Sequence, residues 1–114
     1  MVYYASSTGT SWDLISDCYD DVGGGVGSIA ITPNVWHHFA YVRKGNVWTG
    51  YIDGQQDFTK TVAGTLINKS EDKRIGLWGN STYGYRGYID EFRVTKGIAR
   101  WTENFTPPTV PYGQ

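Results

Sequence analysis

Short runs of apolar and β-branched residues recur along this chain, separated by turn-forming residues at intervals of roughly 8–12 positions. The clearest stretch covers residues 35–62, where three such runs are joined by two short turns. The second turn is Asp53-Gly54, a pair that favours the type I′ hairpin because both central residues need positive φ. The pattern predicts a three-stranded antiparallel meander. Its strands are expected at residues 35–43, 47–52 and 55–62, with the first turn at residues 44–46.

Further elements are expected on both sides of this meander. Residues 2–5 and 11–16 flank Thr8-Gly9-Thr10, which indicates a hairpin. Thr32-Pro33-Asn34 is a turn signal, because proline and asparagine suit tight turns. The remaining predictions are strands at residues 73–78 and 87–94, an exposed loop at residues 79–86, a turn of helix at residues 97–101, and an extended, proline-containing tail from about residue 104.

Composition supports an all-β interpretation. Ile, Val, Thr, Phe, Trp and Tyr together account for 47 of the 114 residues, whereas Ala, Leu, Met, Glu, Lys and Gln account for 20. Branched and aromatic side chains suit a pleated surface and lose rotamer freedom in a helix. The 15 glycines fit a chain with many tight turns. A chain of this length buries one hydrophobic core, so we expect a single domain over residues 1–114.

Charge and cysteine content argue against several classes of function. Ten basic and eleven acidic residues give a net charge of −1, which provides no basic field for nucleic acid. No apolar run approaches the ~20 residues of a membrane span. The first residues lack the basic and then apolar regions of a signal peptide. Cys18 is the single cysteine and has no partner for an internal disulfide. We expect no nucleic-acid partner, no membrane insertion and no signal peptide in this chain.

Five segments between residues 35 and 109 carry the patterns of a known family. They are WHHFAYVR (36–43), YIDG (51–54), RIG (74–76), GYIDEFRV (87–94) and GIARWTENFTPP (97–108). Together they resemble the laminin-G-like, concanavalin A-like lectin/glucanase superfamily, and the last is especially similar to versions found in phage virion and bacterial surface proteins. The resemblance implies an antiparallel jelly-roll β-sandwich that serves as a carbohydrate-binding or adhesion module. It also implies a location in a virion, outside the cell or at a cell surface.

The N-terminal end departs from this family pattern. Family members usually carry additional strands before the region that matches residues 1–34, including an edge strand that pairs with the closing one. Here a predicted strand begins almost at Met1, so the sandwich is expected to lack N-terminal edge strands. An aromatic-rich edge without a partner attracts other chains. We therefore expect protein partners, either in a homo-oligomer or within a larger assembly.

Pairs of adjacent polar residues are expected to be structural. A retaining glycosidase of the glucanase type needs two carboxyl groups about 5–5.5 Å apart on one side of the sugar. Asp90 and Glu91 are neighbours in a predicted strand, and such neighbours point to opposite faces. We therefore predict that the chain is not an enzyme. By the same argument His37 and His38 do not share a metal ion, and His38 is expected to be a hydrogen-bonded core residue.

Calcium is the one cofactor that the sequence suggests. Asp17, Asp20 and Asp21, together with nearby backbone carbonyls, offer hard oxygen ligands on a glycine-rich loop. Their spacing matches no EF-hand, and a solvated acidic loop is the alternative interpretation.

Aromatic residues are the strongest functional signal, at 16% of the chain. Sugars present apolar C–H faces that stack on indole and phenol rings, so exposed aromatics in loops favour a glycan site. The expected ligand-binding residues are Tyr83, Tyr85, Asn80, Arg86 and Trp101, while Trp36, Trp48 and Trp78 are assigned to the core. Two hypotheses stay open: a noncatalytic module that binds surface glycans, and a structural virion or surface protein whose jelly roll contacts other subunits.

Overall fold

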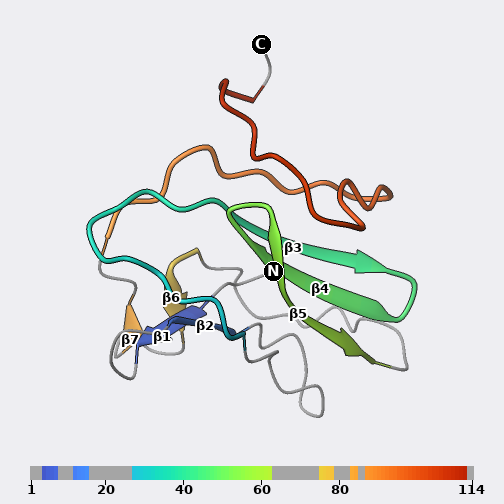
Figure 1. Ribbon diagram of the computed structural model, residues 1–114, viewed down its shortest axis with the longest axis horizontal. Helices are drawn as coiled ribbons and strands as arrows, with labels where there is room; N and C mark the ends of the chain where they lie inside the picture. Colours follow the sequence, from blue (N-terminus) through green and yellow to red (C-terminus); the bar gives the residue numbers. More distant parts are fainter. Residues whose placement is uncertain are drawn as a thin grey trace.

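Antiparallel strands make up the regular structure of the computed structural model, which describes residues 4–7, 12–15, 27–62, 75–78, 83–84 and 87–112 (Figure 1). Within these ranges the strands are β1 (Tyr4–Ser7), β2 (Trp12–Ile15), β3 (Phe39–Lys44), β4 (Val47–Ile52), β5 (Gln55–Thr61), β6 (Leu77–Trp78) and β7 (Tyr83–Gly84). They pair as β1-β2, β3-β4-β5 and β6-β7. This part of the chain contains no helix that could cross a membrane. The all-β prediction is confirmed.

The central sheet, β3-β4-β5, is the predicted meander. Strand β4 pairs antiparallel with β3 from Val47↔Lys44 to Ile52↔Phe39, and with β5 on its other side. Asp53 and Gly54 both have positive φ, 49° and 79°, as a type I′ turn requires. The first turn is a two-residue loop in which Gly45 has a φ of 60°. Both turns therefore lie where the residue pattern predicted them.

Strand β3 begins at Phe39, four residues later than predicted. The preceding turn ends at Asn34, whose φ of 63° is in the left-handed region. The backbone N–H of His38 then donates to the Asp53 carboxylate at 2.8 Å. A side chain from the second hairpin therefore takes the amide that a longer β3 would have used, and this shortens the strand.

The outer strands agree only in part with the prediction. The β1-β2 hairpin is confirmed, with Ser7 opposite Trp12. Strand β6 lies at the end of the segment predicted over residues 73–78. The prediction of an exposed loop over residues 79–86 is wrong at Tyr83 and Gly84, because these residues form β7 and pair with β6.

Aromatic side chains pack on both faces of the central sheet. Trp48 is 2% exposed, and Tyr41 stacks on it with ring centroids 5.0 Å apart. A side chain at Gly50 would overlap the ring of Phe58, so this glycine lets that ring lie across the strand. Tyr51 follows Gly50, points to the opposite face and is fully buried. The buried apolar residues are Ile31, Ala40, Trp48, Tyr51, Ile52 and Phe58.

The C-terminal segment, residues 87–112, contains neither strand nor helix. The strand predicted over residues 87–94 is wrong, because Glu91 has a φ of 51°, which interrupts the alternation of a strand. The backbone N–H of Glu91 donates to the Asp90 carboxylate instead of to a neighbouring strand. The helical turn predicted at residues 97–101 is also wrong, and there Gly97 has a φ of 90°.

This segment is nevertheless fixed to the central sheet (Figure 1). The backbone N–H of Phe105 donates to the carbonyl of Gly54 at 2.9 Å. The Asn104 side chain accepts from the backbone N–H of Gln56 at 2.9 Å and donates to the side chain of Gln55 at 3.0 Å. Residues about 50 positions apart in sequence thus meet at the β4-β5 turn.

Candidate functional site

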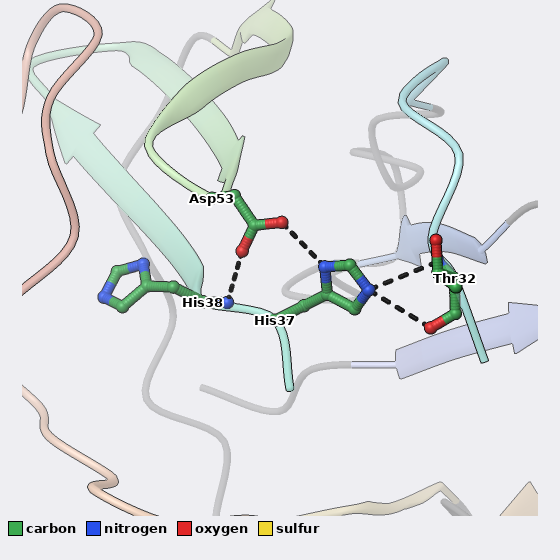
Figure 2. A network of polar contacts seen from close by, with 4 residues as sticks. All are labelled: Thr32, His37, His38 and Asp53. Carbon is green, nitrogen blue, oxygen red and sulfur yellow. Dashed lines mark hydrogen bonds and ion pairs between the residues drawn. The ribbon is translucent and has the colours of Figure 1, made fainter. Parts of the chain in front are cut away.

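Asp53, in the β4-β5 turn, joins the hairpin to the segment before β3 (Figure 2). One carboxylate oxygen lies 2.6 Å from His37 Nδ1, and the other accepts from the backbone N–H of His38 at 2.8 Å. The Asp53 backbone N–H donates to the His38 carbonyl at 2.8 Å. Because the Asp53 side chain is 49% exposed, solvent screens the His37 ion pair, and such pairs contribute about 0.2–1 kcal/mol.

His37 extends this connection to Thr32. Its Nε2 lies 3.2 Å from both the backbone N–H and the carbonyl oxygen of Thr32. The neutral ring accepts from the N–H, and the protonated ring donates to the carbonyl. The network of Thr32, His37, His38 and Asp53 therefore holds the end of the sheet together in either protonation state.

The two neighbouring histidines point in opposite directions (Figure 2). His37 faces Asp53 and Thr32, whereas the His38 ring turns toward the C-terminal segment. The prediction that they do not share a metal ion stays a prediction. Its stated reason, opposite faces of a strand, does not apply, because both residues precede β3.

The His38 ring belongs to a group of four rings, which we call the aromatic cluster: His38, Tyr51, Trp101 and Phe105. Trp101 stacks on Phe105 with centroids 4.2 Å apart and planes 10° apart. His38 meets both rings edge-on at 5.5 Å. Tyr51 meets Phe105 edge-on at 5.4 Å. The three edge-on pairs are favourable because positive ring edges face negative ring faces, whereas Trp101 and Phe105 pack as parallel rings.

Polar atoms are buried inside the aromatic cluster. His38 Nδ1 and the Tyr51 hydroxyl have no hydrogen-bond partner within the described ranges. Burial raises the pKa of Tyr51, so its phenol stays protonated at neutral pH. His38 is half-buried, and its Nε2 lies 3.4 Å from the Tyr112 hydroxyl. The prediction of a hydrogen-bonded core histidine holds in part: His38 is half-buried, its Nε2 contacts the Tyr112 hydroxyl, and its Nδ1 has no partner among the described residues.

The position of His38 predicts a loss of stability in mild acid. Desolvation by burial lowers the pKa of His38, Asp53 opposes this effect, and Arg93 adds to it. The folded chain then binds the proton more weakly than the unfolded chain, so stability is lost as the pH falls below the unfolded value of about 6.5. We expect the melting temperature of the wild-type protein to fall between pH 7.5 and 5.5. In His38→Phe, which keeps a ring in the cluster, this fall should be smaller. An equal fall in both proteins would contradict the role given to His38.

The predicted ligand-binding residues are only partly described. Trp101 is half-buried and lies in the aromatic cluster. Tyr83 lies on β7, where the backbone alone is described. The other predicted residues lie outside the described ranges: Asn80, Tyr85, Arg86 and the three calcium candidates Asp17, Asp20 and Asp21. Within those ranges no group of three acidic, histidine or cysteine side chains is arranged to hold a metal ion. The glycan and calcium residues stay predictions.

The tryptophans assigned to the core differ in outcome. Trp48 is buried as predicted. The prediction for Trp36 is wrong, because it is 67% exposed. It was counted as a strand residue, but it lies before β3, where strand alternation does not apply. The side chain of Trp78 is not described.

The sequence interpretation missed Phe105 and Tyr112, and it treated Asp53 only as a turn residue. No local signal could have found these contacts. His38 and Tyr112 are 74 positions apart, and Phe105 meets Gly54 across a similarly long stretch of chain. Spacing patterns report only on neighbours in sequence.

The adjacent carboxylates of the C-terminal segment are both bound to backbone amides. Asp90 accepts from the N–H of Glu91 at 2.8 Å, and Glu91 accepts from the N–H of Tyr112 at 2.7 Å. The predicted strand that would have separated them is not formed. Strand alternation therefore gives no information on how these two carboxylates are placed relative to each other.

The described structure indicates a fold class, and the comparison with family models then gives the family. The described residues form antiparallel sheets, with aromatic side chains on both faces of β3-β4-β5, as expected of an all-β domain. The chain belongs to the concanavalin A-like lectin/glucanases superfamily, whose laminin-G-type family model matches residues 1–103. Its fold class is therefore the antiparallel jelly-roll sandwich of that superfamily. The comparison with curated proteins gives no match. The comparison with solved structures gives none either.

Proposed function

We propose that this chain is a noncatalytic recognition module that binds carbohydrate, as part of a virion or cell-surface assembly. Its superfamily comprises lectins as well as glucanases, so a lectin-like binding role is within the family's range. The observation that carries the proposal is Trp101, which is half-buried and stacked on Phe105 at 4.2 Å. A fixed indole with part of its surface accessible is the group on which the apolar face of a sugar stacks.

His38 is a polar side chain that contacts the Trp101 ring, with ring centroids 5.5 Å apart. His38 meets the Trp101 ring edge-on, and its Nδ1 has no partner among the described residues. Beyond His38 lies the half-exposed carboxylate of Asp53. Asn104 follows Trp101 by three positions in sequence, is exposed, and is bonded to Gln55 and Gln56. One aromatic platform with a few convergent polar groups is the usual composition of a small-molecule site.

The proposal excludes glycoside hydrolysis for chemical reasons. A retaining or inverting glycosidase needs one carboxyl group that donates a proton and a second that acts as nucleophile or base. Asp90 and Glu91 each accept a hydrogen bond from a backbone N–H, so both carboxylates are already engaged within the C-terminal segment. The aromatic cluster itself contains no carboxylate. Recognition without turnover is the activity that these residues support.

The experiment is a printed glycan panel probed with the wild-type chain and two variants. Trp101→Ala removes the stacking platform, so we expect its binding to weaken about tenfold or more. Trp36→Ala is the matched control, because Trp36 is an exposed tryptophan outside the aromatic cluster. It should bind as the wild type does. Unchanged binding by Trp101→Ala would remove the aromatic cluster from the site.

A second candidate function is assembly with other protein subunits. The observation that favours it is the row of exposed apolar residues in the C-terminal segment, where Tyr88 is 85%, Val94 66% and Ile98 67% exposed. Several exposed large apolar residues in one segment are a feature that a protein interface would cover. In that case the chain would be an obligatory oligomer in solution and would bind nothing on the glycan panel. The two roles are compatible in one surface assembly.

A further inference from the structure

Tyr112, near the C-terminus, is held by three groups from distant parts of the chain. Its backbone N–H donates to the Glu91 carboxylate at 2.7 Å. The Arg93 guanidinium lies over its ring, 3.7 Å from the centroid. Its hydroxyl lies 3.4 Å from Nε2 of His38. Tyr112 is therefore fixed by specific contacts with Glu91, Arg93 and His38.

The contact between the Tyr112 hydroxyl and His38 Nε2 lies next to Trp101, the proposed sugar platform. His38 lies between Trp101, which it meets edge-on, and the Tyr112 hydroxyl. A sugar that stacked on Trp101 and bonded to His38 Nε2 would need the position that the hydroxyl now holds. We propose that Tyr112 is an exchangeable plug, which competes with carbohydrate for His38 and Arg93. This inference rests on the proposed carbohydrate function and adds a means of regulating it.

The way the tail is held fits reversible release. Residues 108–111 are exposed, and Val110 is 62% exposed. Between Phe105 and Tyr112 the described chain makes no backbone–backbone hydrogen bond with the sheet. Figure 1 shows the red segment that leads to Tyr112 rising away from β3-β5 in this view. The plug is thus a single residue at the end of an exposed stretch, and its removal leaves the sheet intact.

Tyr112 and the residues that it contacts differ in whether the family model covers them. The family model ends at residue 103, so Tyr112 lies outside it, whereas His38, Arg93 and Trp101 lie inside. The receptor groups therefore come from the family domain, and the group that covers them comes from the following segment.

The test uses the 114-residue chain and a synthetic peptide. The peptide is Thr-Val-Pro-Tyr-Gly-Gln, residues 109–114, with a fluorescent label. We expect it to bind the Tyr112→Ala variant, whose site is open, about tenfold more tightly than the wild type, whose own tail fills the site in most molecules. A peptide with alanine in place of its tyrosine should bind neither. Val110→Ala is the matched control, since it changes an exposed residue of the same tail and should behave as the wild type.

The same variants are then applied to the glycan panel. If the plug is seated in about nine molecules of ten, its loss raises apparent affinity about tenfold in Tyr112→Ala. Tyr112→Phe keeps the ring under Arg93 and removes the hydroxyl from His38, so its gain should be smaller. This variant also shows that any effect does not come from misfolding, because its packing is preserved.

The outcomes separate the two proposals. Equal peptide binding by the wild type and Tyr112→Ala, or binding by neither, would overturn the plug whatever the panel shows. Selective peptide binding with an empty panel for every protein would support the plug as a tail contact and contradict the carbohydrate function. In a third outcome, the peptide binds Tyr112→Ala selectively, but this variant binds glycans no more tightly than the wild type. That result would contradict competition between the tail and the sugar.

Discussion

Replacing Gly54 with alanine is expected to lower the free energy of unfolding by about 2–4 kcal/mol, through left-handed strain and overpacking together. Gly54 has a φ of 79°, which an alanine adopts only with strain. A methyl group there would also overlap the carbonyl oxygen of Phe105. That oxygen belongs to backbone, which a rotamer change cannot move. The β4-β5 turn and the C-terminal segment would have to separate.

Gly45→Ala is the control for this effect. Gly45 has a similar φ of 60°, but no atom lies within 4 Å of the position its Cβ would take. This variant should lose only the strain component, about 1–2 kcal/mol. Chemical denaturation of both variants measures the difference. Equal losses would contradict the contact between the turn and Phe105.

Gly54→Ala should also weaken recognition, because Phe105 is the ring on which Trp101 stacks. If Phe105 is displaced, the Trp101 indole loses the ring on which it stacks. On the glycan panel we expect Gly54→Ala to bind more weakly than Gly45→Ala, at a temperature where both remain folded. Fixing the C-terminal segment to the hairpin is therefore a condition for the site.

Replacing Trp48 with alanine is expected to cost about 3–5 kcal/mol, the range for loss of a large buried aromatic side chain. Trp48 is 2% exposed, stacks on Tyr41, and carries the Arg43 guanidinium over its ring at 5.3 Å. Its removal leaves a cavity on one face of the central sheet. Trp36→Ala is the control, with an expected change within about 0.5 kcal/mol because Trp36 is exposed. Comparable losses in the two variants would contradict the assignment of the core.

The local parts of the fold could be predicted from sequence because their causes are local. Asp53-Gly54 specifies a type I′ turn through two positive φ values, and alternating residues specify the strands beside it. The segment over residues 87–94 alternates in the same way, yet it forms no strand. Glu91 adopts a left-handed conformation there, and hydrogen bonds to Asp90 and from Tyr112 fix it. Tertiary contacts override the pattern at this point.

The site was predictable only through Trp101. A tryptophan in a segment without a strand pattern indicates a possible ring platform, and Trp101 lies in the aromatic cluster. Phe105 and His38 pack against Trp101, and Tyr112 contacts His38 from 74 positions away in sequence. The roles of these three residues therefore depend on the fold. Asp53 illustrates the same limit. Its turn conformation is local, whereas its bond to His37 depends on where the preceding segment lies.

The central claim is that the aromatic cluster recognises carbohydrate. The most direct measurement compares the wild type, Trp101→Ala and Trp36→Ala on one printed glycan panel, with all three proteins confirmed as folded by their melting curves. Our account predicts that the wild type and Trp36→Ala bind the same glycans, and that Trp101→Ala binds them about tenfold more weakly or worse. Equal binding by all three proteins, or binding by none, would contradict it.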